Sequence, residues 1–97
     1  MPHMKTLTIE SKTYGTHNVL LDDEDYERVM AEGKWNIIKS LNSFYAVAVY
    51  RPGLYLHRFL TNLPSWKEGL VVEHVNKNGL DNRKENLRVY AILDRPV

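Results

Sequence analysis

The residues best suited to chemistry lie in one stretch, 71–89, which reads VVEHVNKNGLDNRKENLRV. It sets a histidine, several amide side chains and two arginines around a short loop, a grouping that suits phosphodiester chemistry. The β-branched residues before His74 predict that it ends a strand, and Asn78–Gly79 predicts a positive-φ turn that reverses the chain. Residues 87–91 predict the returning strand. His74 would accept a proton from water while an amide oxygen, from Asn86 at the start of that strand, fixes its ring.

This stretch resembles the HNH endonucleases of the ββα-metal superfamily, in particular the small phage and intron-type group. The core of that group reads roughly D-H-x-N-x-N-x-L-D-N-R-x-x-N-L-R, and the positions in register here are His74, Asn76, Asn78, Gly79, Leu80, Asp81, Asn82, Arg83, Asn86, Leu87 and Arg88. The likeness covers about residues 19–89, with a nuclease-like core at about 55–91. So dense a match is more specific than one short motif. Apart from the histidine and Asn86, the polar loop positions are expected mainly to build the loop, because short amides bond their own backbone.

The resemblance implies a role for each of three residues. His74 would be the general base that deprotonates a water molecule for attack on phosphorus. Asn86 would hold the histidine ring by a hydrogen bond, and the alternative is that it satisfies backbone groups. Glu73 stands where the family has a metal-binding aspartate, and would ligate Mg²⁺ or Mn²⁺ if the protein is active. The additional methylene moves the carboxylate by about 1–1.5 Å, which an octahedral Mg²⁺ site tolerates poorly.

The chain departs from the family pattern a second time after residue 91. The family continues into a helix with a further Asn or His ligand about nine residues beyond the middle Asn, a count that leads here from Asn86 to Arg95. Arginine cannot ligate a cation, and Pro96 disfavours a continuing helix. We therefore expect an HNH-like ββ core that lacks its usual final helix.

Basic side chains near this core are candidate phosphate contacts. They are Arg58, Lys77, Arg83, Lys84 and Arg88. The formal net charge is only +1, but acidic residues concentrate at 22–27 and most of these cations gather around the His74 loop. Arginine offers phosphate a planar fork that lysine lacks. Surface solubility is the alternative for each cation, and Asp81 or Glu85 would pair with the arginines instead.

Hydrophobic periodicity predicts the elements that position this loop. Alternating residues predict one hairpin from strands at 6–10 and 17–21, and a second from strands at 34–39 and 44–50 with a turn at 41–43. Between the hairpins, Asp22 is the expected N-cap of a helix of about eight to ten residues that ends at Gly33, with Asp25 in the sense of a capping box. The resemblance implies a further short helix at 55–60. The chain is thus predicted to form one α+β domain over residues 1–97, with antiparallel hairpins and one or two short helices.

Composition limits the classes of protein that the chain can represent. Its 97 residues suit one domain. The absence of cysteine excludes disulfides, zinc knuckles and thiol nucleophiles. No apolar run approaches the roughly 18–20 residues that span a bilayer, so we expect a soluble, cytoplasmic protein without a membrane partner. The resemblance to the small phage group implies a phage-encoded protein in a bacterial host. Residues 1–3 resemble a cloning remnant.

Two further side chains have alternative interpretations. His57 is expected to pack against Tyr55 or Phe59 and not to act in catalysis. Trp66 precedes the strand that ends at His74, and it is either a lid or a partner contact.

Three functions remain open from the sequence. The first is a metal-dependent DNA endonuclease or nickase of the HNH type. The second is a catalytically degenerate HNH module that binds DNA or inhibits a host protein, since both departures from the family affect metal ligation. The third is a self-associating structural protein, a homodimer whose edge is formed by residues 44–50.

Overall fold

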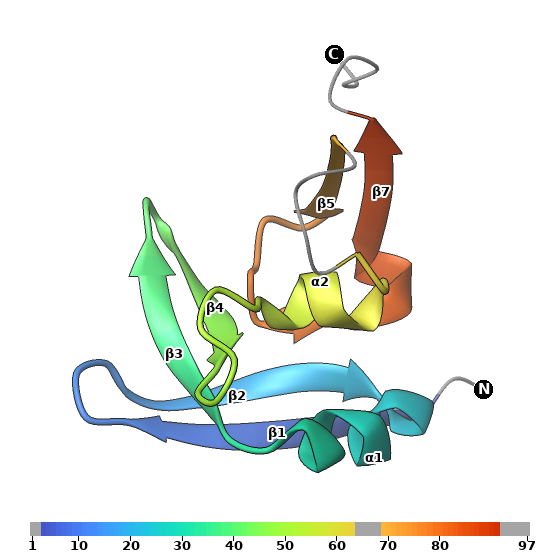
Figure 1. The fold of residues 1–97 in the computed structure, drawn as a ribbon. Coiled ribbons are helices and arrows are strands. Elements are labelled where there is room, and N and C mark those ends of the chain that lie inside the picture. The colour runs from blue at the N-terminus through green and yellow to red at the C-terminus, as the bar shows by residue number, and fades with distance from the viewer. Residues whose placement is uncertain (1–2, 64–68, 92–97) are drawn as a thin grey trace.

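The chain alternates hairpins with short helices (Figure 1). The computed structural model describes residues 3–63 and 69–91. Its elements are β1 (Met4–Ser11), β2 (Gly15–Asp22), α1 (Asp23–Glu32), β3 (Trp35–Ser40), β4 (Ser43–Ala48), α2 (Leu56–Leu60), β5 (Leu70–His74), β6 (Asp81–Asn82), a single 3₁₀ turn (Lys84–Asn86) and β7 (Leu87–Ala91). This is an α+β arrangement with antiparallel hairpins, as the sequence predicts.

The first hairpin is confirmed, with strands longer than expected. β1 and β2 pair antiparallel from Met4 opposite Asp22 to Ser11 opposite Gly15. The buried residues of each strand are two positions apart, Leu7 and Ile9 in β1 and Val19 and Leu21 in β2, which is the period-2 pattern of a sheet with one buried face. β2 also pairs in parallel with the short strand β6, with Leu20 opposite Asp81. This pairing ties the first hairpin to the loop that follows β5.

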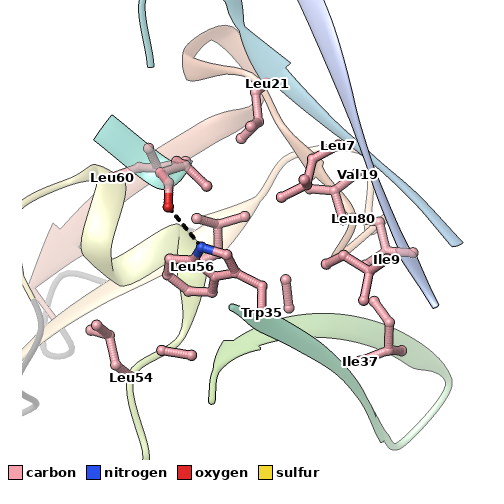
Figure 2. Packing of buried hydrophobic residues seen from close by; sticks show 13 residues of the cluster. Leu7, Ile9, Val19, Leu21, Trp35, Ile37, Leu54, Leu56, Leu60 and Leu80 are labelled. Atoms are coloured by element: carbon pink, nitrogen blue, oxygen red, sulfur yellow. Dashed lines mark hydrogen bonds between the residues drawn. The ribbon is translucent and has the colours of Figure 1, made fainter. Parts of the chain in front are cut away.

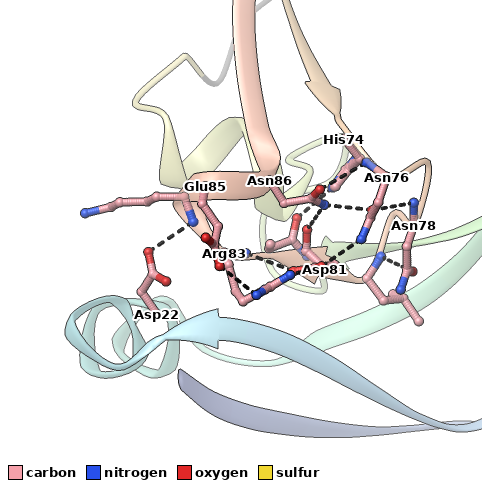
Figure 3. Close-up of polar contacts among 11 residues, drawn as sticks. Asp22, His74, Asn76, Asn78, Asp81, Arg83, Glu85 and Asn86 are labelled. Atoms are coloured by element: carbon pink, nitrogen blue, oxygen red, sulfur yellow. Dashed lines mark hydrogen bonds and ion pairs between the residues drawn. The ribbon is translucent and has the colours of Figure 1, made fainter. Parts of the chain in front are cut away.

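The helix α1 begins after Asp22, as predicted, but the capping box is wrong. The Asp22 side chain makes no cap hydrogen bond. Its Oδ2 accepts a hydrogen bond from the backbone N–H of Lys84 at 3.0 Å (Figure 3). Acidic residues fill the first turn of α1, where they favour the positive end of the helix dipole.

The second hairpin, β3–β4, is also confirmed, although β4 ends at Ala48 and not at residue 50. Ile37 and Ala46 lie opposite each other on its buried face. Trp35 closes the core at the other end of β3, where its indole N–H donates to the Val29 carbonyl at 2.9 Å (Figure 2). An indole buried this way keeps its one donor satisfied.

One hydrophobic cluster joins the two N-terminal hairpins, α1 and α2 (Figure 2). Its buried members are Leu7, Ile9, Val19, Leu21, Val29, Trp35, Ile37, Ala46, Ala48, Leu54, Leu56, Leu60 and Leu80. Leu80 is the member that comes from the loop after β5. Because Leu80 is anchored in this core, the loop that begins at His74 has a fixed position on the molecule.

The third hairpin, β5–β7, forms as predicted. Its strands pair antiparallel from Leu70 opposite Ala91 to His74 opposite Leu87. The short helix expected before it is α2. Among the residues described, no helix is both long and apolar enough to span a membrane. The expectations for Trp66, for Arg95 and for the missing final helix fall on 64–68 and 92–97, outside the described residues.

Candidate functional site: a groove beside His74

A groove open to solvent separates the β3–β4 hairpin from the β5–β7 hairpin, and it has a volume of about 740 Å³. The two hairpins project from the rest of the molecule in Figure 1. The lining residues are Ser40, Leu41, Asn42, Ser43, Tyr45, Tyr55, His57, Val71, Val72, Glu73, His74, Lys77 and Tyr90. The groove thus brings the predicted histidine together with aromatic rings and one lysine from four separate parts of the chain, at 40–45, 55–57, 71–77 and 90.

His74 is held in a defined orientation in the wall of this groove. His74 is 6% exposed, and its Nε2 lies 2.8 Å from Oδ1 of Asn82. The Asn82 amide N–H donates to the Gly79 carbonyl at 3.4 Å, which turns Oδ1 toward the histidine. Since an amide oxygen only accepts hydrogen bonds, this assignment places the proton on Nε2 and the lone pair on Nδ1.

The protonation of His74 suits a base. Burial lowers its pKa below the ordinary histidine value, opposed by the hydrogen bond to Asn82 and by the charge of Asp81. The ring is therefore neutral at neutral pH. A neutral imidazole with one nitrogen fixed as a donor can accept a proton at the other.

Asn86 does not hold His74, which corrects the sequence prediction (Figure 3). Its Oδ1 accepts from the Asn76 backbone N–H at 3.0 Å, and its Nδ2 donates to Asn76 Oδ1 at 2.9 Å and to the Asp81 carbonyl at 2.8 Å. Asn86 thus joins the two sides of the loop by hydrogen bonds. This is the alternative role named from the sequence, in which Asn86 satisfies backbone groups. The residue that fixes the histidine is Asn82. Sequence reasoning missed it because its burial depends on the pairing of β6 with β2, which no local pattern indicates.

The loop between β5 and β6 builds itself from short polar side chains, as expected. Asn76 Oδ1 accepts from the Asn78 backbone N–H at 2.9 Å, and Asn78 Oδ1 accepts from the Leu80 N–H at 3.0 Å. The predicted positive-φ turn at Asn78–Gly79 is wrong, because the left-handed residue is Lys77, with φ of 67°. The reversal therefore occurs one residue earlier than the Asn-Gly pair suggests.

Gly79 is needed for a close approach and not for its φ. A Cβ at this position would overlap the Phe44 carbonyl oxygen and lie 2.7 Å from the Tyr45 ring. The Gly79 N–H donates to Ser43 Oγ at 3.1 Å. These contacts hold the histidine loop directly against β4.

Glu73 is not poised to bind a metal. Its Oε2 accepts from Arg88 at 2.6 Å, and its Oε1 lies 3.7 Å from Lys77 Nζ. The hydrogen bond from Arg88 holds the pKa of this carboxyl below its usual range. Two cations already neutralise the carboxylate. Within residues 3–63 and 69–91, no group of three or more His, Asp or Glu side chains could hold a metal ion, so these residues do not fit the metal site that the resemblance implies.

The cations predicted to contact phosphate are mostly engaged within the protein. Arg83 donates to both oxygens of Asp81, each at 2.7 Å, and to Glu85 at 2.7 Å, which is the alternative pairing named from the sequence. Lys84 lies 2.6 Å from Glu24. The Asp81 carboxyl is buried, and the hydrogen bonds from Arg83 lower its pKa.

The remaining predicted phosphate contacts differ in their access to solvent. Arg58 is only 1% exposed and donates to the Leu70 carbonyl at 3.0 Å, so the prediction that it contacts phosphate is wrong for this conformation. Arg88 is bound to Glu73, although half of its side chain is exposed. Lys77, with 83% of its side chain exposed, offers its ammonium group to solvent at the edge of the groove.

His57 packs against His74 in the wall of the same groove, a contact that no sequence pattern predicted. The two rings meet edge to face with centroids 4.7 Å apart, and His57 meets Tyr55 in the same way at 5.4 Å. The prediction that His57 packs against Tyr55 is confirmed. Burial lowers the pKa of His57 to about 3, with contributions from His74 and Arg58. His57 is therefore a neutral packing partner of the candidate base.

Three comparisons with known proteins found no match. No family model, no curated protein and no solved structure matches the chain.

Proposed function

We propose that this chain is an HNH-type protein that binds DNA and hydrolyses its phosphodiesters, with His74 as the base. The observation that carries the proposal is the neutral ring of His74, fixed by Asn82 at 2.8 Å in the wall of an open groove. A base needs a free lone pair, a fixed orientation and access to its substrate. The order of a strand ending at His74, a polar loop and the returning strand β7 supports the same assignment.

The proton transfer follows from the tautomer. Nδ1 of His74 takes a proton from a water molecule, and the oxygen of that water forms a bond to phosphorus. The bond from phosphorus to one ester oxygen breaks, and the departing oxygen takes a proton from solvent. Asn82 stabilises the imidazolium that forms, because its Oδ1 accepts a hydrogen bond from the Nε2–H group before and after the proton transfer.

Nicking of supercoiled plasmid tests this proposal, assayed with Mg²⁺ and with Mn²⁺ because the resemblance implies one of these ions. The wild type is expected to nick the plasmid, and His74→Ala should lose the activity by about 100-fold or more, the usual contribution of a general base. His17→Ala is the matched control, since His17 bonds the Tyr14 carbonyl in the first hairpin and does not line the groove. Equal nicking by the wild type and His74→Ala would remove His74 as the base.

A second candidate is a DNA-binding module without cleavage. The pairing of Glu73 with Arg88 and Lys77 favours it, because a carboxylate that two cations neutralise is a poor ligand for a divalent ion. This candidate predicts that the wild type binds duplex DNA without nicking it, and that affinity falls steeply as salt rises. Absence of both nicking and binding at low salt would exclude both candidates and direct attention to a protein partner.

A further inference from the structure

The tip of the β3–β4 hairpin exposes a leucine at the edge of the groove. Ser40 pairs with Ser43, so Leu41 and Asn42 are the central residues of a two-residue turn. Leu41 is 93% exposed and lines the groove beside His74. Figure 1 shows this tip projecting away from the core. At this exposure the side chain buries almost none of its apolar surface against the residues that the structure describes.

The backbone at this tip is also strained. Leu41 has φ of 53°, whereas Asn42 is not among the residues with positive φ. This sign pattern is that of a type II′ turn, whose first central position normally holds glycine. Lys77, the other left-handed residue at this edge, touches the tip through its carbonyl, 3.5 Å from Ser43 Oγ. Strained backbone conformations of this kind are concentrated at active sites and ligand-binding sites.

Cations lie on both faces of the same tip. On the side of the groove, the Lys77 side chain is 83% exposed, and its ammonium group lies 3.7 Å from the Glu73 carboxylate. Lys39, exposed on the opposite face, lies over the Phe44 ring at 5.9 Å. An apolar pocket on a protein partner would contact only Leu41 and would have no use for the two lysines. In duplex DNA, by contrast, the apolar bases lie between two phosphate backbones, so a leucine with a cation on each side complements the duplex.

We propose that this tip is a wedge for duplex DNA: Leu41 inserts between stacked base pairs from the minor groove, and Lys39 and Lys77 contact the phosphates on either side. Apolar wedges of this kind unstack one base step and bend the duplex. The inference rests on the proposed function and deepens it, because it defines the substrate as a bent duplex whose backbone is brought to the groove of His74.

Substitutions at Leu41 separate the wedge from the fold. Leu41→Asn keeps a residue that tolerates left-handed φ but removes the apolar group, and Leu41→Met keeps the apolar group. The two variants and the wild type are compared for affinity by fluorescence anisotropy on a labelled 25-base-pair duplex, for bending by energy transfer between the duplex ends, and for Tm. Leu41→Asn should weaken affinity by about tenfold and abolish bending, since it loses the burial of one leucine side chain, whereas Leu41→Met should retain both. The Tm of Leu41→Asn should be equal to or higher than that of the wild type.

The outcomes distinguish this inference from the proposed function. If Leu41→Asn binds and bends DNA as the wild type does, the wedge is excluded while DNA binding stands. If the wild type binds without bending, the wedge is equally excluded. If the wild type binds no duplex even at low salt, the proposed function fails and the wedge with it.

Discussion

The buried histidines His57 and His74 should make the stability of the protein sensitive to mild acid. His57 stays neutral in the folded protein because burial lowers its pKa to about 3. In the unfolded chain its pKa returns to about 6.5. Between these values the unfolded state binds a proton that the folded state does not, so the free energy of unfolding falls as the pH falls. For His57 alone, linkage between pH 7 and pH 5 gives a loss of about 2 kcal/mol.

The other titratable groups with shifted pKa values either add to this loss of stability or do not titrate between pH 7 and pH 5. His74, whose pKa burial also lowers, adds a loss of the same sign. The carboxyl groups of Glu73 and Asp81 have pKa values below their usual range because of their arginine partners, so both remain ionised at pH 5. The change between pH 7 and pH 5 therefore reports mainly on the histidines.

Urea denaturation at the two pH values measures the effect. The free energy of unfolding of the wild type should be lower at pH 5 than at pH 7 by about 2 kcal/mol or more. His57→Phe keeps a flat ring but has no titrating group, so its loss between the same pH values should be smaller than that of the wild type by about 2 kcal/mol. The comparison is made within each variant, so a change in the stability of His57→Phe at pH 7 does not affect it. A wild type that is equally stable at both pH values would refute the reasoning, as would a His57→Phe variant that loses as much as the wild type.

Three further changes test how the loop is held, each by urea denaturation. Asn86→Ala should lower the free energy of unfolding by about 2–4 kcal/mol, because three hydrogen bonds are lost and their buried partners remain, and a loss below about 1 kcal/mol would contradict the role of Asn86 in joining the two sides of the loop. Gly79→Ala should lower the free energy of unfolding by about 2–3 kcal/mol, because the new Cβ would overlap with β4. Gly53→Ala is the control and should lower it by about 1 kcal/mol, since a Cβ there meets nothing within 4 Å. Equal losses for the two variants would argue against the close approach of Gly79 to β4. Arg83→Gln should cost about 3 kcal/mol at pH 7 by leaving the buried Asp81 without its cation. Since a lowered carboxyl pKa contributes stability that is lost as the pH falls through the folded value, Arg83→Gln should lose less stability than the wild type on acidification from pH 5 to pH 2, and an unchanged loss would argue against the pair.

Local patterns in the sequence predicted most of the elements correctly. The period-2 alternation in β1–β2 and β3–β4 indicates both hairpins, because each strand buries one face and its partner is near in the chain. The β-branched residues before His74 indicate β5 for the same reason. The capping box at Asp22 failed because a residue more than sixty positions away, Lys84, offers a backbone donor to the same carboxylate.

The sequence by itself determined that one histidine, a polar loop and several cations lie close together, since all of them fall within twenty residues. Only the tertiary structure decided what each of them does. The parallel pairing of β6 with β2 buries Asn82 against His74, and the packing of α2 places His57 edge to face against the same ring. Hydrogen-bond partners and protonation depend on burial and on distances between distant segments. A pattern of neighbouring residues therefore identifies the candidate base but not the amide that orients it.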